Sequence, residues 1–418
     1  MIKRQTDLEP TKSITKDLKI AFFLLVVSFW LAGDLTGCGG KSSLEPDAGV
    51  TDGESDDSDA SEHNENDGGQ EVSELPLLGP GLFLGSTFYG SGDPPESDLR
   101  SALQDGAESG MNAFSFYVDW FDLENPDGEI NTSELQAALA WQRDLGFTPL
   151  LNLTIIDIAE LNFPEDLKSP DGVHLADGLA FDSQIVEERL FKVLDSVVPL
   201  LANYGGFLLV LGNEVDRYFS DYPDADLEAY ARLIGRARDY VHSLVEGMAV
   251  GVTLTSQGLL EKTVFNALRP VTDVIPFNYY PLITTWGDDW LKVKGLEEIS
   301  GDIAELINLQ NGAPIVIQEL GCPSGEGSGS SQEHQASCFE HLFAALGEHE
   351  NVRFVSVFTL FDFDEATCDL IVEFFGLTEE DLPGGLYENW RSYLCTLGML
   401  NPDYSPKPSW GVFLDSSE

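Results

Sequence analysis

The feature that most constrains the fold is a repeated alternation, from residue 76 onward, between short apolar runs of strand length and longer segments of helical period. Such alternation is typical of a parallel sheet with crossover helices. Eight units follow one another, which favours closure of the sheet into a barrel. The expected strands span residues 82–86, 113–118, 148–156, 207–211, 249–254, 274–278, 314–318 and 354–359. We therefore expect an α/β fold with a single (β/α)8 TIM barrel over residues 76–418.

The segments between the expected strands carry apolar residues three or four positions apart, as amphipathic helices do. The clearest helices are expected at residues 132–145, 183–203, 225–245, 296–309 and 332–346. The competing architecture is an open doubly wound sheet, which usually places a Gly-rich phosphate loop after its first strand. Gly79, Gly81 and Gly85 lack the GxGxxG spacing, and no GxxxxGK[ST] occurs in the chain. The sequence therefore favours the barrel over an open or mixed sheet.

The chain begins with a basic segment, an apolar run and a small-residue stretch that ends in Cys38. The apolar run, residues 20–33, is shorter than the roughly 20 residues that span a bilayer. It fits the apolar region of a cleaved signal better than an N-terminal anchor helix. Residues 1–37 resemble a bacterial lipoprotein signal peptide, which implies acylation of Cys38. We therefore expect an exported protein that its lipid attaches to the cell envelope, at the outer membrane or cell surface.

The segment after Cys38 is acidic: residues 41–75 carry twelve acidic side chains and one lysine. It holds few large apolar residues, and such a segment stays disordered. Because like charges repel, the chain extends there. Residues 38–75 are thus expected to form a disordered tether that holds the barrel off a membrane; a solvated tail without this role is the alternative.

The barrel segment is itself strongly acidic, with 56 acidic and 16 basic side chains in residues 76–418 and a formal charge of −40. Nucleic acid is not an expected partner, because its phosphates bind proteins through Lys and Arg. Neutral substrates are the natural expectation, although solubility in a salty habitat explains the acidity equally well. We expect a monomer.

Four cysteines remain after Cys38, an even number that is consistent with two disulfides in an oxidising compartment. Three connectivities are possible. Pairing of nearest neighbours joins Cys322 to Cys338 and Cys368 to Cys395. No CxxC spacing indicates a metal site.

Two glutamates directly follow the expected fourth and seventh strands, namely Glu214 and Glu319. Functional groups of a (β/α)8 barrel come from the C-terminal strand ends, so both carboxylates should lie at one mouth. Hydrolysis of a glycosidic bond needs two such groups, one to attack the anomeric carbon and one to protonate the leaving oxygen. A separation of about 5 to 5.5 Å favours a covalent intermediate, and a gap beyond about 10 Å excludes it. A rim salt bridge is the alternative for either glutamate alone.

The ordered motifs resemble the clan A glycoside hydrolases over most of residues 80–415. Asn213-Glu214 matches the acid/base motif after strand four of that clan, and Glu319 matches the nucleophile after strand seven. The resemblance implies a retaining glycosidase in which Glu319 attacks as a carboxylate. Glu214 then acts as general acid and afterwards as base, and Asn213 binds the sugar 2-hydroxyl.

Further stretches extend the resemblance. Residues 120–128 look like the clan's segment after strand two, and residues 406–410 look like its C-termini. Residues 273–281 look like strand six, where the family carries a Tyr that hydrogen-bonds the nucleophile; either Tyr279 or Tyr280 could supply it. The Asn-Tyr-Tyr-Pro stretch resembles the endo-β-1,4-galactanases, while mannan, xylan and glucan stay open as substrates.

The chain departs from the clan at three strand ends. Clan members commonly show an Arg near strand two, a His near strand five and a Trp at strand eight. Here strand two ends with Tyr117 to Trp120, strand five with Leu254 to Gln257, and strand eight with Leu360 to Asp364. A distant family within the clan, or a member that has lost activity, would explain these differences.

Aromatic side chains at the mouth are a second indication of sugar binding, because a CH-rich pyranose face packs well on an aromatic ring. Trp286 and Trp290, in a loop with Gly287, are the favoured platform. The other aromatic residues considered for this role are Phe88, Tyr89, Trp120 and Phe361.

Other chemistries are disfavoured. The six histidines form no HxH cluster at a strand end, and no GxSxG elbow of a serine hydrolase occurs. The acidic turns lack EF-hand spacing, so no metal and no cofactor are expected. The leading hypothesis is therefore a glycoside hydrolase that cleaves a β-linked polysaccharide or oligosaccharide. A carbohydrate-binding surface lipoprotein without catalysis is the alternative, followed by a structural surface protein.

Overall fold

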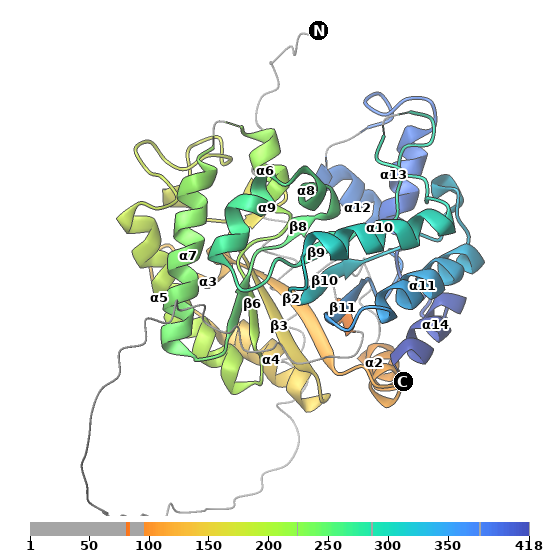
Figure 1. Cartoon of the computed structure of the whole chain (residues 1–418), viewed down its shortest axis with the longest axis horizontal. Helices are drawn as coiled ribbons and strands as arrows, with labels where there is room; N and C mark the ends of the chain where they lie inside the picture. The colour runs from red at the N-terminus through yellow and green to blue at the C-terminus, as the bar shows by residue number, and fades with distance from the viewer. Residues whose placement is uncertain (1–80, 84–95, 224, 286, 376–377, 418) are drawn as a thin grey trace, which may run out of the picture.

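The sheet of this protein closes on itself. A computed structural model describes residues 81–83, 96–223, 225–285, 287–375 and 378–417. The strands form one sheet in the order β7-β6-β3-β2-β1-β11-β10-β9-β8, and every pairing in it is parallel. Its two ends, β7 (Ala249–Gly251) and β8 (Leu254–Thr255), are consecutive pieces of one stretch of chain. The expected eight-stranded barrel is therefore confirmed, with its fifth strand interrupted at residues 252–253 (Figure 1).

The other barrel strands lie close to their expected positions. They are β1 (Gly81–Phe83), β2 (Ala113–Asp119), β3 (Thr148–Thr154), β6 (Leu208–Val210), β9 (Phe277–Tyr279), β10 (Ile315–Leu320) and β11 (Val352–Phe358). The sixth strand is shorter than expected, because Pro276 has no N–H to donate to a ladder. The third ends at Thr154, after which β4 (Ile156–Asp157) and β5 (Glu160–Leu161) form a small antiparallel hairpin.

Helices surround the barrel (Figure 1). The five expected from sequence are α4 (Ser133–Asp144), α5 (Gln184–Asn203), α7 (Leu227–Leu244), α10 (Leu296–Leu309) and α11 (Gln332–Gly347). The others are α2 (Glu96–Glu108), α3 (Trp120–Leu123), α6 (Val215–Asp221), α8 (Ser256–Glu261), α9 (Thr263–Leu268), α12 (Glu365–Phe375), α13 (Leu386–Cys395) and α14 (Pro408–Ser417). Short 3-10 turns lie at η1 (Glu165–Leu167), η2 (Arg269–Val271) and η3 (Glu326–Ser328).

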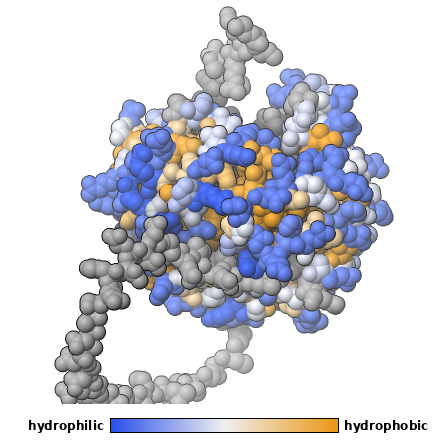
Figure 2. All heavy atoms as spheres, in the orientation of Figure 1, coloured by the Kyte–Doolittle hydropathy of each residue, from blue (hydrophilic) through white to orange (hydrophobic). Residues whose placement is uncertain are grey.

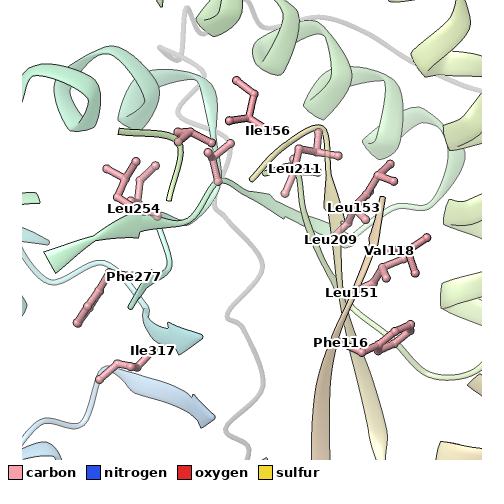
Figure 3. Packing of buried hydrophobic residues seen from close by; sticks show 14 of the residues in the cluster. Phe116, Val118, Leu151, Leu153, Ile156, Leu209, Leu211, Leu254, Phe277 and Ile317 are labelled. Atoms are coloured by element: carbon pink, nitrogen blue, oxygen red, sulfur yellow. The ribbon is translucent and has the colours of Figure 1, made fainter. Parts of the chain in front are cut away.

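The hydrophobic core has a large layer between the strands and the helices. Side chains such as Phe116, Leu151 and Leu209 from neighbouring strands lie together in it (Figure 3). A smaller cluster gathers apolar residues that lie mostly in the N-terminal halves of the strands: Ala113, Leu150, Leu208, Val210, Ala249, Val274, Val316 and Phe354. Along a strand, residues two positions apart share a face, so the same face of β2, β3 and β10 continues toward the mouth with Tyr117, Asn152 and Gln318. The barrel interior thus changes from apolar to polar toward the strand C-termini.

Hydrophilic side chains cover much of the face in Figure 2, in keeping with the acidic composition. Within the part of the chain that the structure describes, no helix is long and apolar enough to cross a membrane. The signal segment, Cys38, the tether, Phe88, Tyr89 and Trp286 lie outside the described residues.

One disulfide, Cys368–Cys395, joins α12 to α13, as nearest-neighbour pairing predicts. The second predicted pair is wrong in this structure: Cys322 and Cys338 are buried thiols. Burial, followed by the hydrogen bond with Cys338, raises the pKa of the Cys322 thiol. Because the thiolate is the reactive form, this shift disfavours reaction of the Cys322 thiol.

A buried ion pair ties the C-terminal segment to the mouth of the barrel. The Lys407 side chain is fully buried, and its ammonium donates to Asp362 (2.7 Å) after β11 and to the Ser324 hydroxyl (2.8 Å) after β10. The backbone N–H of Gly398 donates to the same carboxylate (2.9 Å). A buried charge is tolerated only with such partners, so these contacts join three segments that are far apart in sequence.

We expect Lys407→Met to lower the free energy of unfolding by about 3 to 5 kcal/mol, because it leaves the Asp362 carboxylate buried without its cation. The double variant Lys407→Met/Asp362→Asn should lose less, since no uncompensated charge remains. Urea unfolding followed by circular dichroism measures both. Equal losses in the single and double variants would contradict this account.

Candidate active site

Glu214 is held at the mouth by a tight turn after β6. Gly212 has a φ of 113°, and a Cβ there would meet the Val215 side chain at 2.8 Å, so only glycine fits. The backbone of the next residue is held by β4, because the Asn213 N–H donates to the Ile156 carbonyl at 2.8 Å. Glu214 then takes a left-handed conformation with a φ of 47° and precedes α6. The turn thus fixes the direction of the Glu214 side chain.

Glu319 is directed by an irregularity in β10. The pairings of this strand with β9 and with β11 both shift register between Ile317 and Leu320. A bulge of this kind re-aims a side chain and is common beside active sites. The Glu319 side chain is buried and accepts a hydrogen bond on each oxygen, from the Tyr117 hydroxyl on Oε1 and from the Tyr280 hydroxyl (2.5 Å) on Oε2.

The sequence left open whether Tyr279 or Tyr280 meets this glutamate, and the geometry selects Tyr280. The hydroxyl of Tyr279 instead donates to Asp302 (2.9 Å) on α10, away from the pair. Tyr117, on β2, is a partner that the sequence did not predict. Its position two residues before the C-terminal end of a strand is the signal that could have revealed it.

An amide links the two glutamate environments. Asn278 Nδ2 donates to Glu214 Oε1 (3.0 Å) and to Asn213 Oδ1 (3.1 Å), and Asn213 Nδ2 donates in turn to Asp157 (3.1 Å). Asn278 also lies close enough to Glu319 to lower the pKa of that carboxyl group. The sequence placed Asn278 in the strand-six motif without a role, and it did not single out Asp157.

The two glutamate carboxyl groups differ in the interactions that set their pKa values. Burial, and next the charge of Glu319, raise the pKa of Glu214 to about 8, against one opposing hydrogen bond from Asn278. Burial raises the pKa of Glu319 as well, but hydrogen bonds from Tyr117 and Tyr280 oppose it. Donors that favour the charged form lower a pKa. Hydrogen bonds from Tyr117 and Tyr280 thus favour the ionised form of Glu319, whereas burial beside that charge favours the protonated form of Glu214.

Aromatic rings border this site: Tyr280, which the sequence predicted, and two rings that it did not single out. Tyr280 contacts Phe358 at the end of β11 and Tyr393 on α13, with ring centroids 6.3 Å and 5.6 Å apart. The charges of Glu214 and Glu319 contribute to the raised pKa of Tyr393, after burial. No periodic pattern leads from the sequence to Tyr393, because α13 lies in an insertion after strand eight.

The predictions for Trp120 and Phe361 as sugar contacts are wrong. Trp120 is fully buried against Phe163, and its indole N–H donates to Glu124 (2.9 Å). Phe361 is also buried. Trp290 is half-buried and packs against the apolar cluster around Leu291. These rings pack against core residues. The loops that the sequence placed at the mouth are therefore partly buried.

Histidine, cysteine and carboxylate side chains form no cluster of three or more that could hold a metal ion within the described ranges. The carboxyl pair offers acid–base chemistry, since hydroxyl donors favour the charged form of Glu319 and the neighbouring charge favours the neutral form of Glu214.

Solved structures with a similar fold include an exo-β-1,4-mannosidase from Opitutaceae bacterium strain TAV5, with a TM-score of 0.59 and 17% identity over 83% of this chain and 61% of that chain. A GH5_18 protein from Streptomyces cattleya in complex with GlcNAc has a TM-score of 0.60 and 15% identity over 81% and 80%. A β-D-glucuronidase from Dictyoglomus thermophilum has a TM-score of 0.51 and 12% identity over 82% and 51%.

The neighbours are TIM-barrel glycosidases. At these identities the likeness establishes the (β/α)8 fold of the chain, which spans less than two thirds of the mannosidase. No protein-family model and no curated protein matches the sequence.

We expect Glu319→Gln to lower the pKa of Glu214 from its value of about 8 toward the ordinary range, because the substitution removes the neighbouring negative charge. Titration of carboxyl carbons by NMR measures this shift. Glu340→Gln, on the exposed side of α11, is the matched control and should leave the Glu214 titration unchanged. An unaltered Glu214 pKa in Glu319→Gln would show that the two groups do not interact.

Proposed function

We propose that this barrel is a retaining glycoside hydrolase acting on a β-linked polysaccharide or oligosaccharide. The observation that carries the proposal is the unequal hydrogen bonding of two carboxyl groups at strand ends of one mouth. Glu319 has a hydroxyl donor on each oxygen, whereas Glu214 has the raised pKa that a general acid needs near neutral pH. The glycosidase neighbours and the clan A motifs support the same assignment.

In the first step, a Glu319 carboxylate oxygen attacks the anomeric carbon while the bond to the leaving oxygen breaks. Glu214 gives its proton to that oxygen, and a covalent glycosyl ester forms. In the second step, the ionised Glu214 takes a proton from water as the water oxygen bonds to the anomeric carbon. The ester bond breaks, and its electron pair returns to Glu319.

The charges beside the pair favour a neutral substrate. Asp216 is buried and accepts from the Thr255 hydroxyl (2.6 Å), and Asp157 bonds Asn213 at the same mouth. Both carboxylates contribute to the raised pKa of Glu214, so the local field is negative. A uronic acid would meet repulsion there. We therefore favour a neutral β-linked hexose such as mannose, which occurs in the ligand of similar GH5_18 structures, over glucuronic acid.

One observation favours the alternative of a binding protein without catalysis. Asn213, expected to bind the sugar 2-hydroxyl, is 4% exposed; its amide nitrogen donates to Asp157 and its amide oxygen accepts from Asn278. Together with the three clan residues that are missing, this arrangement is compatible with a barrel that retains sugar contacts alone. Catalysis and binding differ in whether reducing ends are released.

We further propose that the protein acts at the cell surface. The lipobox-like segment ending at Cys38 supports acylation of that residue, and the acidic residues 41–75 support an extended tether. The lipid would keep the barrel near the cell that takes up the products.

Glu319→Gln should abolish release of reducing ends from β-mannan and of dinitrophenol from 2,4-dinitrophenyl β-D-mannoside, because the attacking carboxylate is lost. Glu214→Gln should lower activity on β-mannan by about 10²- to 10⁴-fold. With the dinitrophenyl leaving group, which needs no acid, this variant should release its first equivalent rapidly and then stall. β-Galactan, xylan, glucan and an aryl β-glucuronide complete the panel.

Two outcomes would contradict the proposal. Full activity of Glu319→Gln would remove the nucleophile assignment. Binding of a glycan by the wild-type protein, without reducing ends from any substrate of the panel, would favour the binding protein.

The pH profile of kcat/KM should be bell-shaped. Activity requires protonated Glu214, so it falls as the pH rises through a pKa of about 8. It also requires ionised Glu319, whose pKa burial raises, so the acid limb should lie above the ordinary glutamate value of about 4.3. Both limbs are measured by initial rates from about pH 4 to about pH 10. A basic limb near 4 to 5 would contradict the assignment of Glu214.

A further inference from the structure

Glu319 is held by neutral donors. The Tyr117 hydroxyl contacts one oxygen and the Tyr280 hydroxyl the other, and the nearby amide of Asn278 also favours the charged form. The sequence has Tyr117 near the end of strand two, where clan A enzymes commonly carry an Arg. A phenol donates one hydrogen bond without bringing a positive charge. The nucleophile of this barrel therefore relies on aligned hydroxyl groups.

Tyr117 is a rigid donor. Its strand β2 pairs with β3 in unbroken register over seven positions, from Ala113 with Thr148 to Asp119 with Thr154. Burial and the adjacent Glu319 charge raise the pKa of the Tyr117 phenol well above its ordinary value. The hydroxyl thus stays protonated throughout the expected activity range and always donates.

We propose that Tyr117 is a positioning residue that fixes Glu319 and stabilises its carboxylate as the leaving group when the glycosyl-enzyme breaks down. This inference rests on the proposed function. In the first step the charge on Glu319 decreases, so a donor on its oxygen stabilises the reactant more than the transition state. In the second step the charge returns, and the same donor stabilises the transition state more than the ester. Loss of the donor therefore slows the second step selectively.

The test is Tyr117→Phe, which removes the hydroxyl and keeps the ring. With 2,4-dinitrophenyl β-D-mannoside, whose first step is fast, we expect kcat and KM to fall together by about 10- to 100-fold, since one lost hydrogen bond to a charged group costs on this order. Intact-mass spectrometry during turnover should show more glycosyl-enzyme than in the wild type.

A second measurement needs no substrate. Carbodiimide labels protonated carboxyl groups, so the pH dependence of labelling at Glu319, read by peptide mass spectrometry, reports its pKa. Tyr117→Phe should raise this pKa, because a hydrogen bond to the charged form is lost. Tyr240→Phe is the matched control: it removes a phenol that donates to the Asp195 carboxylate (2.6 Å) between outer helices, and it should change neither readout.

The outcomes separate this inference from the proposed function. A wild-type protein that is inactive on the mannoside, or an active Glu319→Gln, would overturn the proposed function, while labelling still reports whether Tyr117 stabilises the Glu319 charge. Wild-type kinetics and an unchanged Glu319 pKa in Tyr117→Phe would overturn the inference. A lower kcat at constant KM, with no accumulated ester and a reduced Tm, would assign Tyr117 a purely structural role.

Discussion

The parallel ladder that closes the barrel is the constraint on which the site depends. Tyr117 and Glu319 are 202 residues apart, yet they meet because β2 and β10 end at the same mouth. Closure occurs at the interrupted fifth strand, whose halves pair with β6 on one side and β9 on the other. Glu214 lies in the turn after β6, and Asn278 lies in β9. Any slip in one strand would move a member of this network away from its partner.

Local sequence patterns predict much of this arrangement. The expected helix at residues 296–309 matches α10 at both ends, and the strand-end rule placed Glu214 and Glu319 at one mouth. Side-chain environments depend on tertiary packing, which the pattern does not encode. Trp120 follows a strand end, as a mouth residue should, but its ring faces Phe163 in the core. The choice of Tyr280 over Tyr279 likewise depends on which of the two side chains points to Glu319 and which to α10.

The polar interior near the mouth has a cost that a purely structural barrel would avoid. Carboxyl groups at Glu214, Asp216 and Glu319 are all shifted toward the neutral form by burial. Replacing such groups by apolar ones often stabilises a protein. Their clustering therefore indicates a site shaped for chemistry or recognition, because perturbed carboxyl groups gather where function requires them. The apolar layer at the opposite end of the barrel supplies the packing that tolerates this cluster.

The buried Lys407 ammonium has a consequence for the order in which the molecule is completed. Residues 324 and 362, which flank the mouth after the last two strands, receive their shared cation from a lysine near the C-terminal end of the barrel. During synthesis, the strands and both glutamates emerge before this residue. A nascent barrel thus holds an uncompensated carboxylate beside its mouth, and the arrival of Lys407 completes the neutralisation. The C-terminal segment therefore completes the rim of the mouth, since a chain cut short before it would leave the Asp362 carboxyl group without its cation.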